Sequence, residues 1–218
     1  MRPLLRVILI IATFFATTFV IMKLTGILTA DQIEYFLLQA KSSSPIYVAI
    51  IIALLLFSDL FIAIPTLTVI ILSGYFLGQT YGAIAALLGM LFAGIFGYTI
   101  SRFYGDSIFA FLIKDPHKRN EAIVTFTKHG VMMILLSRAL PILPEVTACL
   151  SGMTRMKFTL FITAWLASAF PYVMIATYAG SISSVENPKP ALFTAIAIST
   201  SLWISWIIYH RLRIKPNM

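Results

Sequence analysis

The feature that most constrains this sequence is a set of apolar runs long enough to cross a lipid bilayer. Residues Tyr81–Ser101 form such a run without a single charged side chain. A membrane-spanning helix needs roughly 20 mainly apolar residues, because every backbone polar group must be hydrogen-bonded within the segment. Further runs of this length are Leu4–Leu24, Phe158–Tyr178 and Ala191–Tyr209. The sequence therefore predicts an all-α integral membrane protein.

The composition agrees with this class and excludes several functions. The chain has 218 residues, of which 60% are hydrophobic and 11% charged, whereas soluble domains carry about 25% charged residues. The net charge is +8, but no basic stripe interleaved with aromatic residues indicates nucleic-acid binding. Cys149 is the only cysteine, so we expect no internal disulfide, no metal site and no cofactor. No phosphate-binding loop, nucleophile elbow or zinc-protease motif occurs, so we expect no catalytic residues and no enzymatic activity.

Two other apolar stretches are interrupted in ways that a simple spanning helix does not tolerate. Pro45–Gly78 is too long for one span and contains Asp59, while Val131–Gly152 contains Arg138 and Glu145. Each stretch divides into two apolar pieces of about half the spanning length. We expect helix breaks at residues that disfavour a continuous helix, and these are Pro65, Gly74, Pro141, Pro144 and Gly152. Kinks alone would also account for the prolines.

The distribution of Lys and Arg predicts how the chain threads through the membrane, because cytoplasmic loops carry an excess of both. Most of them lie near the two termini, in the 102–130 connection and in the short 153–157 link. If all these segments are cytoplasmic, Pro45–Gly78 begins and ends outside, and Val131–Gly152 begins and ends inside. Each stretch is then a re-entrant hairpin, and the two enter from opposite faces. The alternative, a full span over residues 45–64, places the basic connection outside, against the charge bias.

Each predicted hairpin is followed by a spanning helix, so the two units form an inverted repeat, a common plan among transporters. The tripeptide Leu-Ser-Gly ends both hairpins, at residues 72–74 and 150–152. We divide the chain into an N-terminal part (1–44), a core (45–180) and a C-terminal part (181–218). The first should hold an uncleaved anchor helix and an amphipathic interfacial helix, and the last a spanning helix and a basic tail.

The charges inside the interrupted stretches, Asp59, Arg138 and Glu145, are the candidate substrate-binding or ion-binding residues. Ionisable side chains at membrane depth are costly and usually face a water-filled cavity, and opposed hairpins bring their tips together. Other interpretations stay open: Asp59 as a helix cap, Arg138 reaching the cytoplasmic face, and Glu145 as a cap after Pro144. Glu145 is either a residue that exchanges protons or a structural partner of Arg138.

Short motifs accompany the predicted breaks: Gly-Tyr-Phe-Leu-Gly at 74–78, Arg-x-x-Pro-x-x-Pro-Glu at 138–145, and Gly-Met-Thr-Arg at 152–155. Together they resemble the DedA/VTT-domain family, also called SNARE-associated Golgi proteins, over about residues 45–180. The resemblance implies paired re-entrant hairpins in the bacterial cytoplasmic membrane and lipid translocation or scrambling. Bacterial DedA members usually carry a second arginine six residues after the first, and here that position is Pro144. The pattern is therefore closer to the VTT branch.

These observations predict a membrane transporter. The first hypothesis is a lipid translocase or scramblase, in which Arg138 contacts the headgroup phosphate. The second is a proton-coupled carrier of a small solute or ion, in which Asp59 or Glu145 takes up the proton. The third is a non-transporting membrane protein that supports envelope integrity. The expected partners are membrane lipids and, for the second hypothesis, protons. We expect a bacterial cytoplasmic membrane location with both termini in the cytoplasm, and the sequence does not define the oligomeric state.

The inverted arrangement predicts that residue 43 lies outside the cell and residue 120 inside. Single cysteines introduced as Ser43→Cys and Asn120→Cys, in a Cys149→Ser background, should react with a membrane-impermeant thiol reagent from opposite sides. Labelling of both positions from the same side would exclude the inverted repeat.

Overall fold

The computed structural model describes residues 2–25, 44–62, 64–139 and 142–183, with Ile33, Tyr35 and a few positions between 193 and 204. Every regular element in these ranges is helical, which confirms the all-α class. In order they are α1 (Arg2–Thr25), α3 (Pro45–Ser58), α4 (Thr66–Leu112), α5 (Pro116–Leu136), a 3₁₀ turn (Ser137–Ala139), α6 (Leu143–Met153) and α7 (Phe158–Ser181). The predicted interfacial helix and the predicted span Ala191–Tyr209 fall mostly outside the described residues.

Two segments are long and apolar enough to cross a bilayer, namely Thr66–Gly105 in α4 and Phe158–Ser181 in α7. Their surfaces carry large exposed apolar side chains, including Leu88, Phe92 and Phe170. Such side chains are unfavourable over a wide surface in water but suit a lipid environment. The long helices are therefore consistent with a membrane protein whose exterior faces hydrocarbon.

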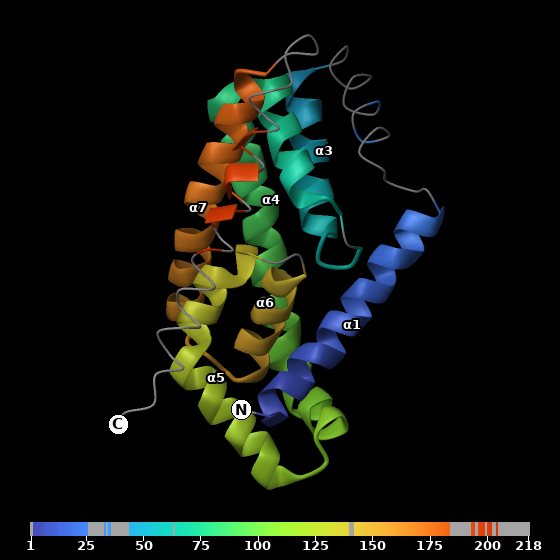
Figure 1. The fold of residues 1–218 in the computed structure, drawn as a ribbon, viewed down its shortest axis with the longest axis vertical. Helices are drawn as coiled ribbons and strands as arrows, with labels where there is room; N and C mark the ends of the chain where they lie inside the picture. Colours follow the sequence, from blue (N-terminus) through green and yellow to red (C-terminus); the bar gives the residue numbers. More distant parts are fainter. Residues whose placement is uncertain are drawn as a thin grey trace.

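The first half of the core folds as a helical hairpin followed by a long helix. α3 leads into the loop 59–65, and α4 then runs back alongside α3 (Figure 1). At Gly78, where φ is 74° and ψ is 172°, the chain reverses again, in a conformation essentially restricted to glycine. The Ser73 hydroxyl donates a hydrogen bond to the Gly82 carbonyl at 3.2 Å, so the two arms of α4 lie close together. We call α3 and residues 66–77 the first hairpin.

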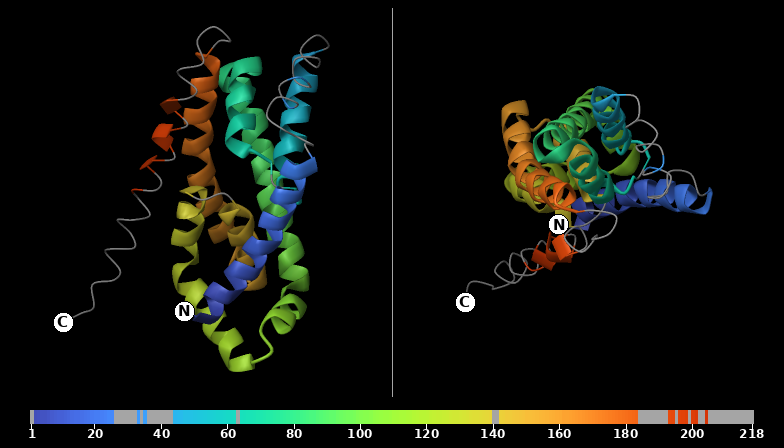
Figure 2. Two further views of the ribbon diagram at one scale, coloured as in Figure 1. Left: turned by 45° about the vertical axis from the view of Figure 1, so that its right-hand side comes forward. Right: turned by 90° about the horizontal axis from the view of Figure 1, so that it is seen from above.

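The second half repeats this plan in the opposite direction. α5 leads into the 3₁₀ turn, α6 returns, and α7 then runs along the length of the molecule (Figures 1 and 2). We call α5 and α6 the second hairpin. The first hairpin occupies the upper half of Figure 1 and the second enters from below, so their inner turns meet near mid-height. Two stretches far apart in the sequence are thereby brought to one place.

One predicted helix break is wrong, because Gly74 lies inside α4, which breaks at Gly78 instead. Gly152 lies in the last turn of α6, one residue before the helix ends. Pro65 and Pro144 do lie at breaks, immediately before α4 and in the first turn of α6, where the missing N–H of proline costs no helical hydrogen bond. Pro141 lies outside the described residues.

Some predicted helix ends also differ from the structure. α5 begins at Pro116 rather than Val131, because residues 116–130 form an amphipathic helix that buries Ala122 and Phe126. α4 likewise continues to Leu112, past the end of its uncharged run. α1 (Arg2–Thr25), in contrast, includes the whole of the predicted span Leu4–Leu24. Hydrophobic run length alone does not mark the end of an amphipathic helix, since the helix continues wherever one face is buried.

The two glycines predicted as breaks instead permit close helix crossings in equivalent places. A Cβ atom at Gly74 would overlap the carbonyl of Thr177 in α7, and a Cβ atom at Gly152 would overlap the carbonyl of Tyr98 in α4. Each returning arm therefore packs against the long helix of the other half of the chain. The repeated Leu-Ser-Gly tripeptide marks this contact rather than a turn.

Replacing Gly74 by Ala should destabilise the fold, because its Cβ would meet backbone atoms that cannot move without separating α4 from α7. We expect a loss of about 1–3 kcal/mol, measured by thermal unfolding of the purified protein in detergent. The matched control is Gly97→Ala in the same helix, where the new Cβ would meet the movable Leu60 Cδ1 at 2.9 Å. Equal stability of the two variants would contradict the packing role of Gly74.

Candidate functional site

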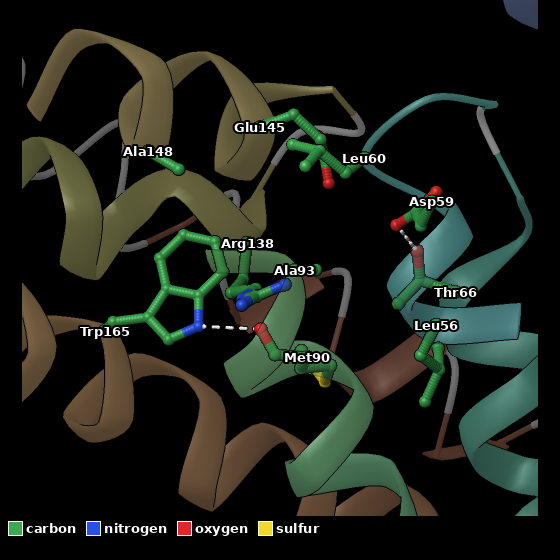
Figure 3. A pocket seen from close by; sticks show the side chains of 10 residues that line it. All are labelled: Leu56, Asp59, Leu60, Thr66, Met90, Ala93, Arg138, Glu145, Ala148 and Trp165. Atoms are coloured by element: carbon green, nitrogen blue, oxygen red, sulfur yellow. Dashed lines mark hydrogen bonds between the residues drawn. The ribbon is translucent and has the colours of Figure 1, made fainter. Parts of the chain in front are cut away.

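A small pocket lies where the inner turns of the two hairpins meet the long helices (Figure 3). We call it the junction pocket. Its volume is about 10 Å³, which is room for about one water molecule. The first hairpin contributes Leu56, Asp59, Leu60 and Thr66, the second contributes Arg138, Glu145 and Ala148, and the long helices contribute Met90, Ala93 and Trp165. The three charges predicted from the sequence are therefore brought together.

Asp59 closes the inner turn of the first hairpin. One carboxylate oxygen accepts a hydrogen bond from the Ile64 N–H at 2.8 Å, and the other accepts one from the Thr66 hydroxyl at 2.7 Å. The side chain is 8% exposed. These bonds tie the two sides of the loop together immediately before α4. Asp59 occupies the C-cap position of α3, its side chain holds the loop to the start of α4, and it also lines the junction pocket.

Arg138 lies in the 3₁₀ turn of the second hairpin and extends into the junction pocket. Its Nε and Nη2 atoms are inaccessible to solvent and have no hydrogen-bond partner among the described residues. Its guanidinium carbon instead lies 4.7 Å from the centre of the Trp165 ring and 6.0 Å from that of Tyr172. Buried polar groups normally find partners, and leaving one without a partner is costly. Arg138 therefore retains donor capacity for a group that is not part of the described chain.

Glu145 stands in the first turn of α6, where the helix dipole favours an acidic side chain. Its carboxyl lines the same pocket as Arg138 and the carboxyl of Asp59, near enough for the three groups to interact electrostatically. Ile142, just before α6, has a φ of 75°, which is strained for a β-branched residue. The second inner turn thus combines a strained backbone with charged side chains.

Two residues that sequence reasoning missed complete the pocket. Trp165 lies within a predicted span, and its position far from the ends of that span, where tryptophan usually lies, was the available signal. Its indole N–H donates to the Met90 carbonyl at 3.1 Å, which joins α7 to α4. Thr66 carried no signal, because its role depends on the reversal of the chain at 59–65. Thr66 thus supports the charge of Asp59, and Trp165 that of Arg138.

The same region offers no metal centre among the described residues, since no group of three or more His, Cys, Asp or Glu side chains is placed to hold an ion. The pocket has the charges of a binding site for a polar group. It combines a cation with free donors and two carboxyls. Such a set can hold an anionic group against Arg138 or exchange a proton between the carboxyls.

Comparisons with known proteins agree with this architecture. The family model described as the VTT domain matches residues 64–182, which include α4, the whole second hairpin and α7. Protein DedA of Escherichia coli (strain K12) is 30% identical over 134 residues, covering 56% of this chain and 61% of DedA. Protein DedA of Escherichia coli O157:H7 matches to the same extent. The match thus spans less than two thirds of these relatives' length, and no solved structure matches this chain.

The two roles of Asp59 can be separated by substitution. Asp59→Asn keeps an oxygen that accepts from the Ile64 N–H, so we expect its stability to stay within about 1 kcal/mol of the unchanged protein. Asp59→Ala leaves the Ile64 N–H and the Thr66 hydroxyl without partners and should cost about 1–3 kcal/mol. Thermal unfolding in detergent measures both, and equal stability of the two variants would contradict the role of these hydrogen bonds in holding the loop.

Proposed function

Because the chain belongs to the VTT-domain family, we propose that it is a membrane transporter that translocates or scrambles phospholipids in the bacterial cytoplasmic membrane. The observation that carries this proposal is the guanidinium of Arg138, which reaches the junction pocket with buried donors that no described residue accepts. Guanidinium groups bind phosphate oxygens through charge-assisted hydrogen bonds, and their planar donor array matches this geometry. A phosphate headgroup is the ligand that these donors fit.

The lengths of the two arms of the first hairpin support a re-entrant arrangement. α3 has 14 residues and so measures about 21 Å, whereas the hydrocarbon core is about 30 Å thick. The arm 66–77 is of similar length, and both end at turns inside the molecule. Non-helical backbone at membrane depth is tolerated only against protein or water, and the inner turns meet this condition by facing each other. Both termini and the basic 102–130 segment would then be cytoplasmic.

This arrangement suggests how a headgroup would cross. A phosphate cannot enter hydrocarbon without a large loss of hydration free energy. Arg138 would replace part of its hydration, while Asp59 and Glu145 would balance the arginine when no phosphate is present. A pocket of about 10 Å³ does not admit a phosphate, so the inner turns must separate during transport. The conformation described here is therefore a closed one.

The carboxyls of Asp59 and Glu145 favour a second candidate, a proton-coupled carrier of a small solute or ion. Two carboxyls that face each other do not both ionise easily, so such a pair holds one proton and releases it when a partner changes. The third possibility, a non-transporting role in envelope integrity, requires only the packed helices. A transport measurement with and without a pH gradient separates all three.

The first test is lipid movement in liposomes that contain the purified protein and a fluorescent phospholipid. We expect Arg138→Gln to lower the rate at least about tenfold, since a lost charge-assisted hydrogen bond costs about 1.5–3 kcal/mol. Asp59→Asn should also lower the rate of lipid movement, although it keeps an oxygen that accepts from the Ile64 N–H. Arg155→Gln, a basic residue outside the pocket, serves as control. A normal rate in the Arg138 variant would refute the proposed function.

Glu145→Gln distinguishes coupling from a structural role. If Glu145 couples transport to protons, the variant should still move lipid downhill but lose any dependence on the pH gradient. If Glu145 only compensates Arg138, the variant should unfold more easily, by roughly 3–5 kcal/mol for a fully buried pair. Melting temperature and gradient-dependent transport are measured on the same preparation. An unchanged gradient response with a stable fold would exclude the coupling role.

A further inference from the structure

Among the described residues, Trp165 makes the closest aromatic contact with the Arg138 guanidinium. The guanidinium carbon lies 4.7 Å from the centre of the indole ring, within the range of a cation–π interaction, and Trp provides the strongest of these. Figure 3 shows the guanidinium beside this ring, with Asp59 on the far side of the pocket. The guanidinium thus lies against an aromatic face, while the Glu145 and Asp59 carboxyls attract its charge without accepting hydrogen bonds from Nε or Nη2.

The orientation of the indole ring is fixed from several sides. Its N–H donates to the Met90 carbonyl at 3.1 Å, and the ring packs against Phe161 in a tilted arrangement with ring centres 5.5 Å apart. A Cβ atom at position 94 would lie 2.5 Å from the indole Cε2 atom, so Gly94 is what allows the ring to lie against α4. Trp165 is 4% exposed. The ring therefore presents one face to Arg138 and has little freedom to turn.

The kind of contact matters for the chemistry of Arg138. A carboxylate partner accepts hydrogen bonds from the guanidinium and so occupies its N–H donors. An aromatic face attracts the charge through the ring quadrupole and leaves donors in the guanidinium plane free. This agrees with Nε and Nη2, which are buried and without partners. The stacking contact thus stabilises the cation and preserves its capacity to bind an oxyanion.

We infer that Trp165 is the positioning residue of this site, which holds the Arg138 guanidinium over the junction pocket with its donors free for an anionic group. The inference deepens the proposed function and rests on it for the role of Arg138 in transport. The contact between the two side chains stands on the geometry alone. Trp165 itself needs no contact with the transported lipid.

The contact is tested first by fluorescence. The chain has three tryptophans, so Trp203→Phe with Trp206→Phe leaves Trp165 as the only one. In this background Arg138→Gln should shift the emission maximum, because a cation beside the ring is removed. The control is Arg102→Gln, since Arg102 lies over Tyr98 at 5.7 Å. An emission maximum that does not respond to Arg138→Gln would overturn the inference, whatever the transport activity.

Transport then tests the role of the ring. Trp165→Phe keeps an aromatic face but loses the hydrogen bond to Met90, whereas Trp165→Leu loses both. We expect Trp165→Phe to retain lipid movement within about threefold and Trp165→Leu to lose about tenfold or more. If Trp165→Phe moves lipid as slowly as Trp165→Leu, and both variants have equally lowered melting temperatures, the indole serves only to join α4 to α7. The inference then fails.

A double variant shows whether Trp165 acts through Arg138. Once Arg138 is Gln, Trp165→Leu should lower transport no further, because its effect passes through the missing guanidinium. Independent losses that multiply would overturn the inference. If Arg138→Gln shifts the fluorescence but moves lipid at the normal rate, the proposed function fails while the contact remains. The two failures are therefore distinguishable.

Discussion

The rest of this structure depends on the cost of placing charge and broken helix inside an apolar protein. An interruption of a helix exposes backbone donors and acceptors, and a charge loses most of its hydration there. The chain meets both costs at one place, by directing two interruptions toward each other. Asp59 accepts hydrogen bonds from the Ile64 N–H and the Thr66 hydroxyl. The Arg138 guanidinium lies over the Trp165 ring. Neither hairpin could bury its inner turn without the other.

The outer ends of the hairpins solve a different problem, which is close packing without large side chains. Gly74 lies against Thr177, and Gly152 against Tyr98. Lipid offers no hydrophobic driving force between helices, so close contact of small residues is a main source of helix association. Each half of the chain thereby holds the returning arm of the other half. The charged centre and the glycine crossings together make the two halves mutually dependent.

Much of this could be predicted from sequence. The broken apolar runs and their charges are sufficient to indicate two hairpins, and the junction pocket contains Asp59, Arg138 and Glu145. The exact breaks were not predictable in the same way. Gly74 and Gly78 occur in one motif, and the sequence does not show which of them breaks the helix. Gly74 stays helical because it packs against α7, whereas the chain turns at Gly78. The start of α5 at Pro116 lies in the polar connection and is not marked by an apolar run, because burial against α1 and α6 takes its place.

Trp165 and Thr66 illustrate a second limit. Their roles arise from contacts between segments distant in the sequence or across a reversal, as in the bond from Trp165 to Met90. A pattern read along one helix contains no record of such a partner. Charged residues in apolar runs are conspicuous by their type, whereas the residues that support them are ordinary in type and specific only in position.

The inner turns of the two halves are alike in position and unlike in chemistry. The first is fastened by the hydrogen bonds of Asp59, while the second contains Ile142 at a φ of 75°, a conformation that stores roughly 1–3 kcal/mol of strain. A molecule with equal halves could exchange its two faces at no net cost in energy. Here the inner turn of the first half is held by hydrogen bonds and that of the second half has a strained backbone, so the two halves are not equivalent in energy. A rearrangement of the two inner turns would therefore relieve backbone strain in one half and break hydrogen bonds in the other, so the two halves would not contribute equally to its energy.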